Sequence, residues 1–128
     1  MQKLERILYA EDESDIQQVA SLALETVGGF ALKICGSGLE AVAEIETFEP
    51  QLLLFDVMMP DMDGPTALAK IRELDDYESI PAVFMTAKVQ PNEVQEYLDM
   101  GAVDVIPKPF DPMALATQVQ EIWERIQS

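Results

Sequence analysis

Histidine is absent from this sequence of 128 residues, and cysteine occurs once, as Cys35. Without histidine, the chain cannot use imidazole in acid–base catalysis, cannot itself carry a phosphohistidine, and lacks the commonest transition-metal ligand. A single cysteine excludes an intrachain disulfide, and we interpret Cys35 as a small buried apolar residue in a reducing compartment. Any nucleophile is therefore a carboxylate, a hydroxyl, a lysine or this one thiol.

Basic residues are also scarce, with 8 lysines and arginines against 24 acidic residues and a formal net charge of -16. Such a surface repels phosphate backbones, so we expect no nucleic-acid partner, and the charge mainly favours solubility. The sequence has no apolar signal segment and no run long enough to span a bilayer, so we expect a cytoplasmic protein without a membrane partner. Hydrophobic residues make up 48% of the chain, which indicates a folded core.

Short apolar runs alternate with amphipathic stretches along the whole chain. The predicted strands are 7–10, 30–34, 52–55, 82–85 and 103–106. Five strands, each followed by a helix, imply a doubly wound α/β fold with a parallel sheet and helices on both faces. Right-handed crossovers favour the flavodoxin-like strand order 2-1-3-4-5. We predict one domain over residues 1–128, with no output domain.

Two of the predicted helices carry details that the structure can test. For the first, Ser14 is the expected N-cap, with Gln17 in the capping-box position and Val27 on the inward stripe. The last helix is expected from about Pro112. Trp123 lies beside its inward stripe, and exposure of this indole would indicate a docking face.

Polar side chains follow four of the predicted strands. Glu11 and Asp12 come after the first strand, Asp56 ends the third, Thr86 ends the fourth and Lys108 follows the fifth. Because ligands of open α/β sheets bind beyond the carboxyl ends of the strands, we expect these residues to converge there. Any one of them alone has an ordinary explanation, such as two acids before a helix or a threonine at a strand end.

Three acids at one rim repel each other unless a cation neutralises them. Oxygen ligands favour Mg²⁺, which we assign to Asp12 and Asp56, with Glu11 bound directly or through water. The backbone carbonyl of Met58 offers a further oxygen. Lys108 lies between two prolines that stiffen its backbone, and the Lys108–Pro109 bond is the candidate for a cis peptide. Its ammonium could pair with Asp56 and later stabilise a phosphoryl oxygen, as could the Thr86 hydroxyl.

Four segments resemble the receiver domain of two-component response regulators over nearly the full chain. They are LYAEDE at 8–13, LFDVMMPDMDG at 54–64, MTA at 85–87 and GAVDVIPKPF at 101–110. The resemblance implies that Asp56 is the phosphoacceptor and that Glu11 and Asp12, with Asp56 and the Met58 carbonyl, hold Mg²⁺. It also implies that Thr86 is the switch hydroxyl and Lys108 the phosphate-binding lysine.

The same resemblance implies a phosphoacceptor switch that takes its phosphoryl group from a histidine kinase or a histidine phosphotransfer protein. Such a protein catalyses only its own phosphorylation and dephosphorylation, and it signals to a separate effector through the fourth helix, fifth strand and fifth helix. One departure is Val105, where receivers often carry an aromatic residue. Met58 and Lys88 flank the path of attacking water in this family, and we hypothesise that Met58 shields the acyl phosphate.

Other functions are compatible with parts of the sequence. The fragment Asp61–Thr66 is similar to the signature of magnesium-dependent phosphatases with an aspartate nucleophile, but Asp56, not Asp61, ends the strand. Asp61 and Asp63 also resemble part of an EF-hand loop, which lacks its other acids here. A third alternative is a protein-binding module that acts without phosphorylation.

Overall fold

Five parallel strands form one sheet in the computed structural model, which describes residues 2–127. The strands are β1 (Arg6–Ala10), β2 (Ala31–Cys35), β3 (Leu52–Asp56), β4 (Ala82–Thr86) and β5 (Asp104–Pro107). Their order across the sheet is β2-β1-β3-β4-β5. The predicted doubly wound fold and strand order are therefore confirmed, with strand bounds displaced by no more than a residue or two.

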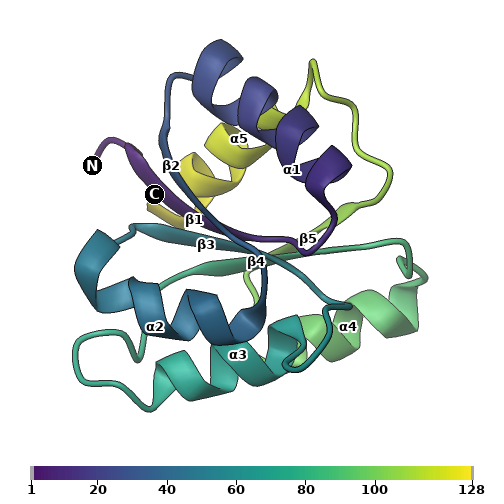
Figure 1. Ribbon diagram of the computed structural model, residues 1–128. Helices are drawn as coiled ribbons and strands as arrows, with labels where there is room; N and C mark the ends of the chain where they lie inside the picture. Colours follow the sequence, from purple (N-terminus) through teal and green to yellow (C-terminus); the bar gives the residue numbers. More distant parts are fainter. Residues whose placement is uncertain (1, 128) are drawn as a thin grey trace.

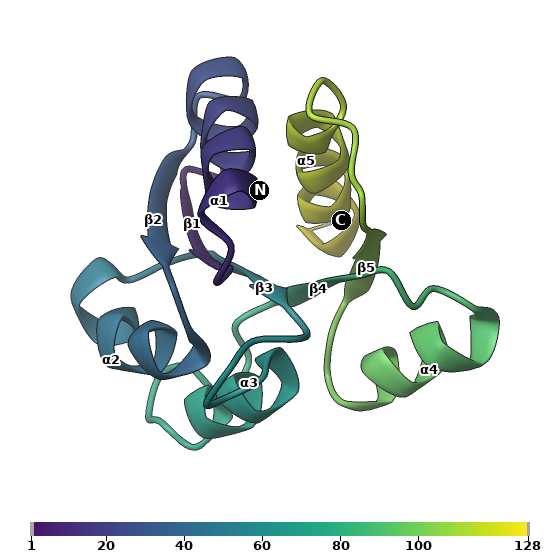
Figure 2. The ribbon, with the colours of Figure 1, turned by 45° about the vertical axis from the view of Figure 1, so that its right-hand side comes forward.

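Helices cover both faces of the sheet. They are α1 (Ser14–Ser21), the π-helical segment η1 (Leu22–Val27), α2 (Gly38–Phe48), α3 (Gly64–Arg72), α4 (Pro91–Asp99) and α5 (Leu115–Gln127). Figure 1 shows α1 and α5 on one face and α2, α3 and α4 on the other, and the turned view of Figure 2 shows the same two layers. None of the helices within residues 2–127 is long and apolar enough to cross a membrane.

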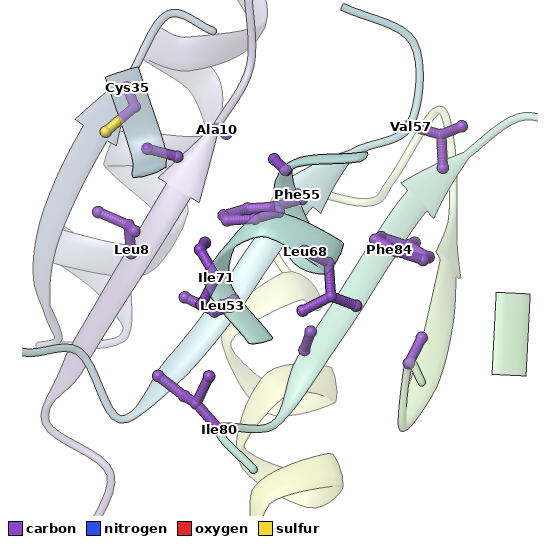
Figure 3. Packing of buried hydrophobic residues seen from close by; sticks show 14 of the residues in the cluster. Leu8, Ala10, Cys35, Leu53, Phe55, Val57, Leu68, Ile71, Ile80 and Phe84 are labelled. Carbon is purple, nitrogen blue, oxygen red and sulfur yellow. The ribbon is translucent and has the colours of Figure 1, made fainter. Parts of the chain in front are cut away.

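The strand β3 is buried along its entire length, because β1 and β4 flank it and helices cover both of its faces. Alternate side chains enter two separate cores. Phe55 belongs with Leu68 and Phe84 to the core under α2, α3 and α4, and Figure 3 shows these three side chains. Leu54 belongs to the core under α1 and α5. Strand periodicity thus divides one apolar run between both layers.

The first helix differs from its prediction at both ends. Its N-cap is Glu13 rather than Ser14, and no side chain caps it. The amide of Gln17 instead donates to the backbone oxygen of Glu11, so this side chain reaches the loop after β1. At the other end the chain continues into η1, whose wider turns rotate Val27 outward and leave Leu24 buried.

The last helix begins at Leu115, after a turn that includes Pro112. Trp123 is buried against the sheet, and its indole Nε1 donates to the backbone oxygen of Gln2 at 2.7 Å. Trp123 is therefore a core residue that fastens the start of the chain to α5, and it does not form an exposed docking face.

Candidate functional site

The carboxyl ends of the strands bring together the polar residues that the sequence singled out. Backbone hydrogen bonds extend the sheet past the strand ends and fix the loops that carry the site. These bonds are Glu11 N to Cys35 O at 3.0 Å, Val57 N to Met85 O at 3.1 Å and Lys108 N to Thr86 O at 2.9 Å. The positions of Glu11, Asp56, Thr86 and Lys108 therefore follow from the pairing of the strands.

The loop after Asp56 folds back onto the strand that precedes it. Gly64 N donates to Val57 O at 3.0 Å, and Asp63 caps α3 by accepting Thr66 N at 2.8 Å. A Cβ atom at Gly64 would lie 2.5 Å from the backbone oxygen of Asp56. Glycine is therefore required for this close approach, which holds the loop against Asp56.

An ammonium and two buried carboxylates form the centre of the site. Lys108 Nζ lies 2.8 Å from Asp56 Oδ1 and 3.0 Å from Glu11 Oε1. Asp56 is 5% exposed and Glu11 only 1%. The Lys108–Pro109 peptide is cis, as predicted. The second oxygen of Glu11 accepts the backbone N–H of Glu13 at 3.2 Å.

The electrostatics of this centre are set by burial and by the shared ammonium. Burial raises the pKa of Asp56 and of Glu11, although the hydrogen bonds from Lys108 oppose the rise. For Lys108, burial favours the neutral amine, but the bonds to Asp56 and Glu11 outweigh it and raise the pKa. One ammonium thus leaves the cluster of three acids with excess negative charge.

The acidic cluster suits a hard divalent cation. Oxygen atoms of Glu11, Asp12 and Asp56 all lie within 4.8 Å of one another, and within residues 2–127 no other trio of acids or cysteine gathers in this way. Asp12 is exposed while the other two are buried, so the cluster opens to solvent on one side. The all-oxygen donor set and the unneutralised charge fit Mg²⁺, which retains waters and takes few carboxylates.

Thr86 and Val105 occupy adjacent strands beside this centre. The Thr86 hydroxyl is buried and accepts the backbone N–H of Lys88 at 3.0 Å, so its own hydrogen remains free to be donated. Val105 pairs in register with Phe84 and is half-buried against the core under α4. In this core the aromatic rings of Phe84 and Tyr97 pack edge to face, with their centroids 5.7 Å apart.

Residues of the loop after β3 have different surroundings. Met58 is 71% exposed and lies two residues after the buried Asp56. That its backbone carbonyl binds a metal ion stays a prediction. Asp63 is engaged as a helix cap, and Asp61 has a positive φ of 69°. Neither belongs to the acidic cluster, so the EF-hand and phosphatase interpretations of this fragment gain no support.

Two residues near the site escaped the sequence-based prediction. The sequence predicts Gln17 in a capping box, whereas its amide donates to the backbone oxygen of Glu11. The sequence pattern predicts Tyr9 only as part of an apolar strand, yet burial and the charge of nearby Glu11 raise the pKa of its phenol. The sequence signal that could have revealed this is the spacing of Tyr9, which precedes the acid Glu11 by two residues.

Comparison with known proteins identifies relatives of this chain. The family model described as the response regulator receiver domain matches residues 7–120. An uncharacterised 14.6 kDa protein of Leptolyngbya boryana is 34% identical over 90% of this chain and 87% of its own length. The response regulator Rre1 of Synechocystis is 30% identical over 95% of this chain. The chemotaxis response regulator CheY4 of Vibrio cholerae has a similar structure, with a TM-score of 0.85, 27% identity and coverage of 94% of this chain and 99% of that one.

Several relatives are longer than the matched region. The chain spans 53% of Rre1 and 49% of the transcriptional regulatory protein CseB of Streptomyces coelicolor. It therefore corresponds to about half the length of such proteins, and to nearly the whole of the CheY4 structure.

Proposed function

This chain belongs to the response regulator receiver domain family, a family of phosphoacceptor signalling switches, and we propose that its phosphoacceptor is Asp56. The carboxylate takes a phosphoryl group from the phosphohistidine of a histidine kinase or a histidine phosphotransfer protein. One observation carries this proposal: Asp56 ends β3 within hydrogen-bonding distance of Lys108 and within 4.8 Å of two further acids.

The chemistry of the transfer follows from these neighbours. An Asp56 oxygen forms a bond to phosphorus while the bond between phosphorus and the histidine nitrogen breaks, and the imidazole keeps the electron pair and takes up a proton. Lys108, 2.8 Å from Asp56 Oδ1 at rest, neutralises phosphoryl oxygens during the transfer. A Mg²⁺ ion held by Glu11, Asp12, Asp56 and the Met58 carbonyl would supply further positive charge to the same oxygens. Hydrolysis of the acyl phosphate later restores the free carboxylate.

The phosphorylated state is read by the face formed by α4, β5 and α5. Thr86 supports this link because its hydroxyl has a hydrogen free for a phosphoryl oxygen, and its movement would also shift the loop that carries Lys88. With Val105 in place of an aromatic side chain, the movement on β5 is small, and α4 carries more of the change. Such a switch needs a coupling of about 1–3 kcal/mol between phosphorylation and the output surface.

We take the effector to be a separate protein. The net charge of -16 argues against direct contact of this chain with nucleic acid, which favours a protein as the effector. The identity of the kinase and of the effector is a matter for interaction experiments with this chain as bait.

Incubation with MgCl₂ and acetyl phosphate, followed by intact mass measurement, tests the proposal. We expect the gain of one phosphoryl group, which borohydride reduction maps to Asp56. The Asp56→Asn variant should gain none, and omission of Mg²⁺ should strongly slow the wild-type reaction. Labelling at any other residue, or multiple turnover of a generic phosphomonoester, would instead support a different nucleophile or a phosphatase. An Asp56→Asn variant that binds the effector with undiminished affinity would indicate a module that acts without phosphorylation.

A further inference from the structure

The side chain of Tyr9 lies directly inward of the acidic cluster. Tyr9 pairs in register with Leu54 of β3, and both belong to the core under α1 and α5. Glu11 follows Tyr9 by two residues, and Asp56 follows Leu54 by two residues. Because side chains alternate along a strand, both carboxylates fall on the same side of the sheet as Tyr9 and Leu54. The phenol is thus on the buried side of both carboxylates.

The hydroxyl of Tyr9 has no partner in this resting arrangement. Among the buried side-chain nitrogen and oxygen atoms of residues 2–127, it is the one without a hydrogen bond. Burial, followed by the charges of Glu11 and Asp56, raises the pKa of Tyr9, which agrees with a phenol close to both acids. A buried donor without an acceptor costs free energy, which a phenylalanine here would avoid.

Phosphorylation changes the hydrogen bonds of Glu11. At rest, Glu11 Oε1 shares the ammonium of Lys108 with Asp56. If Asp56 is the phosphoacceptor, Lys108 turns to the phosphoryl oxygens, and Glu11 Oε1 loses this donor. A Mg²⁺ ion on the solvent side would occupy only part of the acceptor positions of the Glu11 carboxylate. Water cannot readily reach the inward position because Glu11 is 1% exposed. The unpaired donor on the same side of the sheet is the Tyr9 hydroxyl.

We propose that Tyr9 is a positioning residue whose hydroxyl donates to the carboxylate of Glu11 when Asp56 carries a phosphoryl group; this inference rests on the proposed function. The bond holds Glu11 in place at the rim after Lys108 has left it. The unpaired hydroxyl raises the free energy of the resting state, whereas in the phosphorylated state the hydroxyl has an acceptor. Tyr9 therefore favours the phosphorylated state over the resting one.

Replacing Tyr9 by phenylalanine tests this role, because the ring and its packing remain. The probe is beryllium trifluoride, a phosphoryl mimic that binds the aspartate carboxylate, titrated at fixed MgCl₂ and followed by calorimetry. We expect Tyr9→Phe to bind it about tenfold more weakly, the loss of one hydrogen bond to a charged group. The melting temperature without the probe should equal or exceed that of the wild type. Tyr77→Phe, at a half-buried tyrosine in the segment between α3 and β4, is the control and should bind the probe normally.

Each outcome separates this inference from the proposal on Asp56. Equal affinity of Tyr9→Phe and wild type for the probe overturns the role of Tyr9 and leaves Asp56 as the phosphoacceptor. Equal loss of melting temperature with and without the probe also overturns it, since the hydroxyl would then have a permanent partner such as buried water. A wild-type protein that takes up neither the probe nor a phosphoryl group refutes the proposed function itself.

Discussion

Lys108 is the one side chain that directly neutralises the buried acids of the candidate site among residues 2–127. Its ammonium is shared by two carboxylates whose pKa values burial raises, so their ionised forms depend on it. The same ammonium competes with any cation for Asp56. Lys108 therefore serves stability at rest and charge neutralisation during phosphoryl transfer.

Replacing Lys108 by methionine should separate these two contributions. Without Mg²⁺, the variant should lose about 3–5 kcal/mol of unfolding free energy, because it leaves buried carboxylates unpaired. Phosphorylation by acetyl phosphate should slow by about 10²–10³-fold. Urea unfolding and intact mass measure the two effects, and Mg²⁺ should restore part of the stability. The exposed Lys70→Met is the charge control. An unchanged phosphorylation rate would remove Lys108 from the mechanism.

Met58 is exposed beside a buried phosphoacceptor candidate, which suits a cover over the acyl phosphate. We expect Met58→Asn to shorten the lifetime of the phosphorylated protein severalfold, because an amide can hydrogen-bond the attacking water where a thioether shields the phosphoryl group. Decay of the phosphorylated mass after removal of the donor gives the rate. Met113→Asn alters an equally exposed methionine, 75% against 71%, and should leave decay unchanged. A lifetime unaffected by Met58→Asn contradicts the shielding hypothesis.

Among the elements, the turn from β3 into α3 has the tightest steric requirement. We expect Gly64→Ala to cost about 1–3 kcal/mol of unfolding free energy, because the new methyl group would meet the Asp56 backbone oxygen. The displaced loop should also slow phosphorylation. Gly36→Ala is the matched control. A Cβ atom at Gly36 would find its nearest non-adjacent heavy atom, the amide nitrogen of Gln17, at 3.9 Å. Chemical denaturation compares both variants, and equal stabilities would show that the loop relaxes freely.

The strands could be predicted well because apolar runs of four or five residues between turn signals have few other interpretations. Helix faces were harder to predict. Val27 was placed inward on a period of 3.6 residues, but η1 changes the period and Leu24 takes that place. On α4 the inward residue is Tyr97, whereas the neighbouring apolar residue Leu98 lies at the exposed margin. Such rotations depend on packing between elements and leave little trace in local sequence.

The candidate site was predictable for a topological reason. Parallel strands end at one rim, so Glu11, Asp56, Thr86 and Lys108 had to gather there once the strands were located. The interaction of Gln17 with the loop backbone and the unpaired hydroxyl of Tyr9 were not predictable. Both depend on which side chains meet across layers, and a strand tyrosine has the same local pattern as any core residue.

At the scale of the whole molecule, the net charge of -16 opposes the compact state. Raising NaCl from about 0.01 M shortens a screening length of about 30 Å and should raise the melting temperature. At matched ionic strength, MgCl₂ should raise it further in the wild type than in Asp12→Asn. Differential scanning calorimetry measures both changes. A melting temperature that falls with NaCl would mean that attractive ion pairs outweigh the repulsion.

Alkaline pH should destabilise the molecule through its buried thiol. Burial, followed by the charge of Glu40, raises the pKa of Cys35 from 9.0 to about 12. The unfolded chain therefore releases this proton first, so the stabilising contribution is complete below about pH 9 and is lost as the pH rises towards 12. The raised pKa values of Tyr9 and Lys108 act in the same direction from a higher pH.

The Cys35→Ala variant isolates the thiol. Between about pH 9 and 10, we expect the free energy of unfolding to fall by up to about 1.4 kcal/mol per pH unit in the wild type and by clearly less in the variant. Urea titrations at several pH values measure the slopes, and each protein serves as its own reference at pH 7. Parallel slopes in the two proteins would exclude Cys35 as the source.

The indole of Trp123 donates to the backbone near the start of the chain and is buried between α5 and the sheet. As the sole tryptophan, it gives the protein one intrinsic fluorophore, placed in the layer that also holds Tyr9. A red shift of its emission on acylation of Asp56 would report that α5 has loosened from the sheet. A constant spectrum would confine the signal to the opposite layer, and no external dye is needed to distinguish the two.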